Sequence, residues 1–299
     1  MNTRRIVKDN RQLKAVIGMG REEFVALLPA FAEAWHVELR LASPHRVRRI
    51  GGGKKGALKT MEDKLFAVLL YLKTYPTFDV LGFLTDRDRT RACRSTHFLL
   101  SVLGRALGKK LAMPERRIAS VEEFFEKFPE TKDVFLDGTE RPVQRPKDAR
   151  RRKKLYSGKK KRFTRKTIVV ADEKKRILIL TPTRSGRRHD KRLTDKSGLA
   201  DVVPDSVAIF ADTGLQGMQR DHASTLIPKK TTRNNPLTEA DKQNNRIISG
   251  LRIVVEHAIG GMKRFKAAAD IYRNRIPNTD DLFHLLSAGL WNFHLQQTT

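Results

Sequence analysis

Residues 134–138 read Val-Phe-Leu-Asp-Gly, an apolar run that ends in an aspartate and a glycine. Residues 207–214 repeat this pattern as Val-Ala-Ile-Phe-Ala-Asp-Thr-Gly. Short apolar runs rich in β-branched and aromatic residues are typical of buried strands. The two runs therefore predict strands of one sheet, each ending at an aspartate, Asp137 or Asp212.

More strands and helices are expected around these two runs. Residues 167–170 and 176–180 have the same β-branched character, and helical patterns cover residues 191–203, 244–262 and 280–295. Strands interspersed with helices are typical of α/β or α+β layer domains. The sequence thus predicts a layered α/β domain over residues 131–299.

The first third of the chain is expected to be helical. Residues 21–41 predict an amphipathic helix, and residues 61–75, 78–84 and 92–103 predict three shorter ones, the first ended by Pro76. Four arginines, Arg87, Arg89, Arg91 and Arg94, lie at the start of the third short helix. Three short helices with tight links suit a helix-turn-helix that reads DNA. A small helical bundle with a solvated basic turn fits the pattern equally well.

These patterns divide the chain into four segments. Residues 1–56 form a helical segment that ends in a basic, glycine-rich link at 51–56; this link lacks the Gly-Lys-Ser/Thr of a phosphate-binding loop. Residues 57–105 form the helix-turn-helix domain, residues 106–130 a helical connector, and residues 131–299 the α/β domain.

Composition narrows the class of protein and of partner. The 299 residues carry a net charge of +28 and are 39% hydrophobic, so a packed core and a polyanionic partner are both expected. A single cysteine, Cys93, excludes an internal disulfide. The N-terminus lacks the apolar core of a signal peptide, and no window is long and apolar enough for a membrane span. A soluble, intracellular protein is expected.

The most basic stretch is residues 145–166, which hold thirteen Lys or Arg and one Asp. It lies between two predicted strands, whereas localisation signals and disordered tails are more often terminal. Tyr156 and Phe163 are interleaved with the charges and suit stacking on bases. Nucleic acid is the preferred ligand, and a solvated hairpin that binds nothing specific is the alternative.

Three carboxylates are placed differently from the others. Acids at the ends of adjacent strands converge on one edge of a sheet, so Asp137 and Asp212 are expected to hold a hydrated divalent cation. Taken singly, each also suits a turn or a helix cap. Glu256 lies in the predicted helix 244–262, on a polar stripe with Asn245, Ser249, Arg252 and Lys263.

The opposite face of that helix is apolar, with Ile248, Leu251, Val254, Val255, Ala258, Ile259 and Met262. A strand over residues 253–255 is a competing interpretation. An acid with Arg252 one turn before it and Lys263 further along suits a metal ligand bordered by phosphate contacts. A plain Arg252–Glu256 surface pair is the simpler alternative.

Four motifs together resemble the DDE transposases of bacterial insertion sequences. They are Asp137-Gly138-Thr139-Glu140-Arg141-Pro142, Tyr156-Ser157-Gly158-Lys159-Lys160-Lys161, Ala211-Asp212-Thr213-Gly214 and Arg252-x3-Glu256-x6-Lys263. The segment 61–103, with Tyr75-Pro76-Thr77 in its turn, is similar to the helix-turn-helix of that group. The resemblance covers residues 50–296. In this family a tyrosine commonly precedes the arginine of the Glu motif by three residues, and Ser249 stands there.

The resemblance implies an RNase H-like mixed sheet flanked by helices, with Asp137, Asp212 and Glu256 as catalytic and metal-binding residues. It implies two Mg²⁺ ions per site, with Mn²⁺ as a substitute, that activate a water or a 3′-hydroxyl and stabilise the leaving 3′-oxygen. Asp137 is expected to bridge the ions. His189-Asp190 resembles a His-Asp pair of related sequences that orients a ligand or DNA; a helix start with Asp190 near the cap is an equal alternative.

The expected partner is double-stranded DNA, both terminal inverted repeats and target, bound by a homodimer or higher oligomer without a membrane. The location implied is the cytoplasm of a bacterium, at the nucleoid. The DNA contacts expected are Arg87, Arg89, Arg91, Arg94, Arg151, Arg152, Lys153, Lys154, Tyr156, Lys159, Lys160, Lys161, Arg162, Arg252 and Lys263. A domesticated, non-cleaving DNA-binding regulator or architectural protein is the alternative function. An RNA-binding protein is disfavoured because no RNA-binding module is recognisable.

Overall fold

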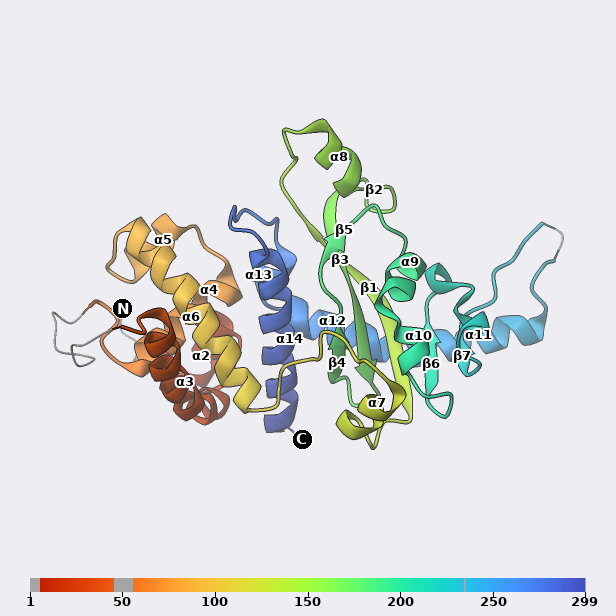
Figure 1. The fold of residues 1–299 in the computed structure, drawn as a ribbon, viewed down its shortest axis with the longest axis horizontal. Coiled ribbons are helices and arrows are strands. Elements are labelled where there is room, and N and C mark those ends of the chain that lie inside the picture. Colours follow the sequence, from red (N-terminus) through yellow and green to blue (C-terminus); the bar gives the residue numbers. More distant parts are fainter. Residues whose placement is uncertain (1–5, 46–55, 234, 299) are drawn as a thin grey trace. The chain divides into compact units, whose positions relative to one another are not determined.

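The computed structural model describes residues 6–45, 56–233 and 235–298. Of the predicted glycine-rich link, residues 51–55 lie outside the described residues. The chain divides into two compact units (Figure 1): residues 1–113, 262–270 and 282–299 form the first, and residues 114–261 and 271–281 the second. The four predicted segment boundaries stay predictions. None of the helices in the described ranges combines the length and apolar character needed to cross a membrane.

The first unit is helical. Its helices are α2 (Asn10–Ile17), α3 (Arg21–Ala42), α4 (Met61–Thr74), α5 (Phe78–Leu84), α6 (Arg89–Lys109), α13 (Lys266–Ala269) and most of α14 (Thr279–Thr298). The helices predicted over 21–41, 61–75 and 78–84 are confirmed. The third short helix was predicted too short: it begins at Arg89, because the Asp88 side chain caps it by accepting a hydrogen bond from Arg91 N at 2.9 Å.

The turn between α5 and α6 depends on one glycine. A Cβ on Gly82 would lie 2.5 Å from the Arg87 carbonyl oxygen, so a larger residue would push the turn apart. Arg87 N donates to the Gly82 carbonyl oxygen at 2.9 Å and closes this turn. The close approach fixes how α6 follows α5.

The second unit is built on a mixed sheet. Its strands are β1 (Asp133–Pro142), β2 (Tyr156–Ser157), β3 (Arg162–Asp172), β4 (Ile177–Leu180), β5 (Arg184–Ser185), β6 (Ala208–Ala211) and β7 (Thr225–Leu226). The order through the centre is β4-β3-β1-β6-β7, in which β1, β6 and β7 are parallel and β3 is antiparallel to β1 and β4. The four predicted strands are confirmed, and with them the α/β class.

One strand end was predicted wrongly. Asp137 does not end β1, which continues to Pro142 because it pairs with β3 as far as Pro142↔Thr164. The parallel pairing of β1 with β6, however, stops at Leu136↔Ala211. Asp137 therefore comes directly after the last pair between these two strands.

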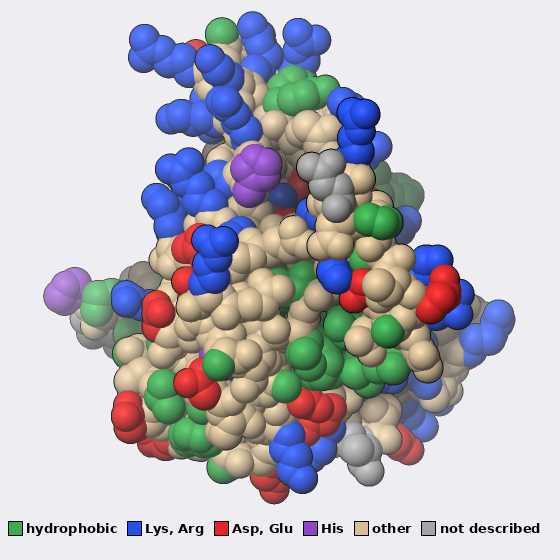
Figure 2. All heavy atoms as spheres, turned by 90° about the vertical axis from the view of Figure 1, so that its right-hand side faces the viewer, with side chains coloured by type: hydrophobic (Ala, Val, Ile, Leu, Met, Phe, Trp, Pro, Cys, Tyr) green, Lys and Arg blue, Asp and Glu red, His purple; other side chains and the backbone are tan. Residues whose placement is uncertain are grey.

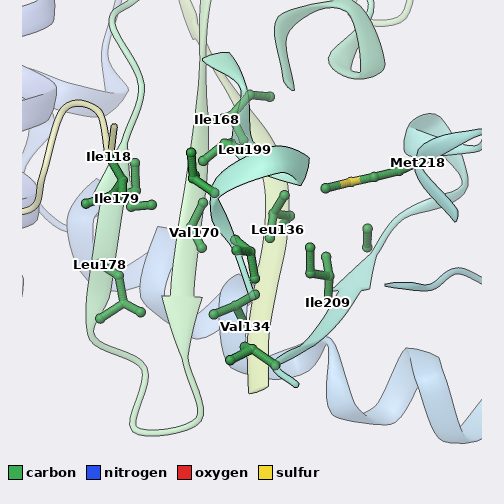
Figure 3. Packing of buried hydrophobic residues seen from close by; sticks show 14 of the residues in the cluster. Ile118, Val134, Leu136, Ile168, Val170, Leu178, Ile179, Leu199, Ile209 and Met218 are labelled. Atoms are coloured by element: carbon green, nitrogen blue, oxygen red, sulfur yellow. The ribbon is translucent and has the colours of Figure 1, made fainter. Parts of the chain in front are cut away.

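Helices cover one face of the sheet. Val134, Leu136, Ile168, Val170 and Ile209 form a buried cluster on this face (Figure 3). The helices α7 (Val121–Lys127), α9 (Asp190–Ser197) and α10 (Leu199–Val202) add apolar residues to it, namely Phe124, Leu193, Leu199 and Val202. We call this side the cluster face.

Three predicted helices are interrupted. The connector is helical only where α6 ends, up to Lys109, and in α7. The helix expected over 191–203 is split into α9 and α10 at Gly198, whose φ of 64° is left-handed. The helix expected over 244–262 is split into α11 (Glu239–Leu251) and α12 (Ile253–Lys263) by a turn at Arg252, and the competing strand over 253–255 is wrong.

The predicted apolar face of residues 248–262 is only half buried. No residue of α11 is buried, and Leu251 is 42% exposed, whereas Val255, Ala258 and Met262 of α12 are buried. Arg252, expected on the polar stripe, is 9% exposed. The apolar period continues across the break, so the sequence pattern did not reveal that the two halves have different surroundings.

The sheet core allows a matched test of packing. Leu178 on β4 is buried in the cluster, so Leu178→Ala is expected to lower the free energy of unfolding by about 2–5 kcal/mol. Leu226 on β7 is 42% exposed, and Leu226→Ala should change it by no more than about 0.5 kcal/mol. Urea unfolding of both variants checks this, and equal losses would contradict the packing described.

Candidate active site

Two aspartates meet where the β1–β6 pairing ends. Leu136 and Ala211, the last parallel pair, both point into the cluster face. Because successive side chains of a strand alternate between faces, Asp137 and Asp212 lie together on the opposite face. Phe135 and Phe210 precede them on that face, with stacked rings 5.1 Å apart. The predicted convergence of Asp137 and Asp212 thus follows from the register.

Arg252 lies against these aspartates. Its Nη1 is 3.5 Å from Asp212 Oδ1, and the turn between α11 and α12 holds it in a buried position. From the sequence, Arg252 is expected beside a metal ligand and in contact with DNA. In the structure its guanidinium forms an ion pair with Asp212.

Glu256 lies one helical turn beyond Arg252. Its N–H donates to the Arg252 carbonyl oxygen at 3.4 Å, and its side chain is exposed. In the described parts of the chain, no three His, Cys, Asp or Glu side chains are grouped closely enough to hold a metal ion. The structure therefore brings Asp137 and Asp212 together and leaves Glu256 nearby, outside a three-carboxylate cluster.

The Asp137 carboxyl has an unusual electrostatic environment. Burial raises the pKa of Asp137 above its ordinary value, and the negative charges of Asp212 and Asp190 raise it further. The Gly138 N–H, 2.7 Å from Oδ1, and the charge of Arg252 oppose this pKa rise only in part. A buried carboxyl that is costly to ionise is typical of sites that bind a cation or move protons.

A buried lysine lies on the other face of the same strands. Lys166 Nζ is 2.8 Å from Asp190 Oδ1 and 3.1 Å from Glu140 Oε1, and it donates to the Arg188 carbonyl oxygen at 3.2 Å. Burial alone would lower the pKa of Lys166, but the hydrogen bonds and charges of Asp190 and Glu140 hold that pKa above its ordinary value. The three side chains join β1, β3 and α9.

This network lies directly behind Asp137. A Cβ on Gly138 would lie 2.6 Å from Asp190 Oδ1, so α9 approaches β1 this closely because residue 138 is a glycine. His189 is the N-cap of α9 but makes no side-chain capping bond, and Asp190 is in the first turn. Asp190 thus pairs with a buried lysine. No local pattern predicts this pair, because Lys166 is one of thirteen cations in its stretch.

The basic stretch forms an exposed projection of the second unit. It contains α8 (Ala149–Leu155), β2 and the start of β3, and Figure 2 shows Lys and Arg side chains gathered over this end. Its expected DNA contacts are all on this projection: Arg151, Arg152, Lys153, Lys154, Tyr156, Lys159, Lys160, Lys161 and Arg162. None of these basic side chains forms an ion pair with an acid in the described ranges.

The four arginines of the first unit differ from one another. Arg87 is partly buried, and its guanidinium donates to Thr85 Oγ1 at 2.9 Å and to Ser95, so it ties the turn to α6. Arg89, Arg91 and Arg94 are exposed on the first turns of α6, where Arg89 and Arg91 form exposed pairs with Asp79 and Asp88. Exposed pairs of this kind contribute little to stability. Lys263, the last residue of α12, is half-buried.

Asp137 gives a test that separates stability from activity. Its raised pKa means that the folded state holds the proton more tightly than the unfolded state. The contribution of Asp137 to stability is therefore fully present below its unfolded pKa of about 3.9, and it is lost as the pH rises through its folded pKa. We expect Asp137→Asn to raise the midpoint of urea unfolding at pH 7, and this gain to vanish in acid. A lower midpoint at pH 7 would show that the ionised carboxylate stabilises the fold.

Lys166 gives the opposite prediction. Lys166→Met leaves two buried carboxylates without their cation and is expected to cost about 3–5 kcal/mol of unfolding free energy. Lys191 is a matched control, because it also pairs with two acids, Asp195 and Asp221, which are exposed. Lys191→Met should cost about 0–1 kcal/mol. Equal losses in urea unfolding would mean that Lys166 has no special role.

Comparison with known proteins agrees with this site. The family model described as DDE superfamily endonuclease matches residues 136–292, more than half of the chain, and this range includes Asp137, Asp212 and Glu256. A Microchaete diplosiphon protein described as "Probable transposase for insertion sequence element IS702" is 30% identical over 235 residues, which are 79% of this chain and 81% of that protein. No solved structure matches. The chain therefore belongs to the DDE superfamily endonucleases, as a DDE transposase of an insertion sequence.

Proposed function

We propose that this transposase hydrolyses phosphodiester bonds at the ends of its own element and transfers the freed 3′-hydroxyl to target DNA. The observation that carries this proposal is the pair of adjacent carboxylates, Asp137 and Asp212, on one face of the sheet at the end of the β1–β6 pairing. Family membership supports the reaction class, because the relative is described as a transposase.

The residues suit divalent metal ions. DDE superfamily endonucleases generally use them. Asp137 and Asp212 supply the oxygen ligands that Mg²⁺ prefers. Burial, and after it the negative charges of Asp212 and Asp190, raise the pKa of Asp137, and a cation would offset both effects. We assign Asp137, Asp212 and Glu256 as the residues that would hold two Mg²⁺ ions, replaceable by Mn²⁺. Such ions would supply Lewis acidity for activating the nucleophile and stabilising the leaving oxygen.

Arg252 supplies a positive charge beside the two aspartates. Because it pairs with Asp212 at 3.5 Å, it offsets part of the repulsion between the two aspartates. If cations held there neutralised the aspartates, the guanidinium would be available for a phosphate oxygen, which it would recognise through its planar set of donors. Glu256 lies one helical turn beyond Arg252, and it is the carboxylate of α12 that we assign to this site.

The fold is compatible with an RNase H-like domain. In that fold the first aspartate lies on the central strand, the second follows the adjacent parallel strand, and the glutamate lies on a later helix. Here β1, β6 and α12 carry Asp137, Asp212 and Glu256 in this arrangement. We propose that α4, α5 and α6 form the helix-turn-helix that binds duplex DNA, with Arg94 of α6 and the basic projection on phosphates. Joining two element ends to a target calls for at least two copies of the chain.

The proposal is tested by incubating the full chain with linear DNA that carries both ends of the element, with Mg²⁺ or Mn²⁺ or with EDTA. We expect metal-dependent nicking at the element boundaries, reduced at least about 100-fold by Asp137→Asn, because ligand-held metal contributes several kcal/mol to such transition states. Glu256→Gln should lose nicking as well.

Two results would contradict the proposal. Tight binding of the ends without cleavage in either metal would favour the non-cleaving DNA-binding alternative. Undiminished cleavage by Asp137→Asn, with the fold checked by circular dichroism, would show that Asp137 is not part of the catalytic site.

A further inference from the structure

Two cavities adjoin on the cluster face of the second unit. The first, about 440 Å³, is lined by Tyr156, Lys159, Arg187, Arg188, Asp190 and Gly214, among others. The second, about 600 Å³, is lined by Arg116, Arg117, Arg184, Arg188 and Lys196, among others. Arg188 lines both, so the cavities meet at this residue, and we treat them together as a groove along the segment from β5 to α9. We call it the β5–α9 groove.

The cations of this groove are of two kinds. Arg116 pairs with Asp281, and Lys166 pairs with Glu140 and Asp190, so these two stabilise the fold. The other basic residues, Arg117, Lys159, Arg184, Arg187, Arg188 and Lys196, have no acidic partner in the described ranges. The carboxylate in the groove, Asp190, pairs with Lys166, which also pairs with Glu140, so the six unpaired cations outnumber it. The groove therefore has an excess of positive charge that no acidic side chain in the described ranges offsets.

The groove begins beside the active site. Asp190 lies against Gly138, the residue after Asp137, and Gly214 is two residues after Asp212. Strand alternation places the Asp137 carboxylate on the opposite face, so a ligand that spans both has to pass around the ends of the β1–β6 pairing. This path is sharply curved.

We infer that the β5–α9 groove binds the phosphates of one unpaired DNA strand that leads away from the active site. Cavities of 440 and 600 Å³ are the size of sites that enclose a drug-sized molecule, and a duplex, whose major groove alone is about 12 Å wide, does not fit into them. A duplex is also stiff over about 150 base pairs, whereas a single strand follows such a turn easily.

Tyr156 adds an observation that favours an unpaired strand. Its ring packs against Phe163 with 5.7 Å between centroids, and 43% of the residue remains exposed at the first cavity. A basic groove with a supported aromatic ring is the usual platform for single strands, because every base can stack on it. This role rests on the proposed cleavage, which leaves a strand end beside Asp137. The groove cations position this strand and do not take part in the chemistry.

The test measures binding of a fluorescently labelled (dT)20 strand and of a 20-base-pair duplex to the full chain in EDTA over a range of salt. The groove variant is Arg184→Ala/Arg188→Ala/Lys196→Ala. Its control, Lys8→Ala/Arg11→Ala/Lys14→Ala, removes the same charge from exposed positions on and beside α2. Thermal melting checks that both variants fold.

We expect the groove variant to bind (dT)20 at least about tenfold more weakly, with a log–log salt slope smaller by about 2, since each phosphate contact on a single strand contributes about 0.7. Duplex binding and the control should change by less than about twofold. Equal weakening for (dT)20 and duplex, or equal weakening by the control, would overturn the inference. Because EDTA prevents cleavage, this result is independent of the nicking assay, and either proposal can fail alone.

Discussion

The parallel pairing of β1 with β6 is the constraint on which the site depends. Its last pair, Leu136↔Ala211, buries both residues in the cluster face, so the next residue of each strand, Asp137 and Asp212, lies on the other face beside its neighbour. A slip of one strand by one residue would turn its aspartate into the apolar cluster and its apolar side chains out of it. The buried residues Val134, Leu136, Ile209 and Ala211 hold this register, and thus the hydrophobic core determines the position of the carboxylates.

Carboxylates that lie close together repel one another, which lowers the stability of the fold. In this structure nearby cations offset part of that repulsion. On one face Arg252 pairs with Asp212, and Asp137 nevertheless keeps a raised pKa. On the other face the buried Lys166 pairs with both Asp190 and Glu140. The first cation has a single contact at 3.5 Å, whereas the second has three close partners and belongs to the fold.

Much of the sheet could be predicted from the sequence because the buried parts of its strands are uninterrupted apolar runs, such as 134–136 and 207–210. The closeness of Asp137 and Asp212 followed from the same runs. Other features depend on tertiary contacts that no local pattern reports. The apolar period runs straight through the break at Arg252, so the exposure of α11 was missed. Lys166 was hidden among exposed cations, and β1 extends past Asp137 because β3 pairs with it, which the residues of β1 alone do not encode.

The central proposal is that Asp137 and Asp212 form a cation site because the register of β1 and β6 places them side by side. The most direct test is an anomalous difference map from crystals of the full chain grown with Mn²⁺. The account predicts a Mn²⁺ peak in contact with both carboxylates, with Arg252 moved away from Asp212. A Mn²⁺ peak elsewhere, with Arg252 still paired to Asp212, would contradict it.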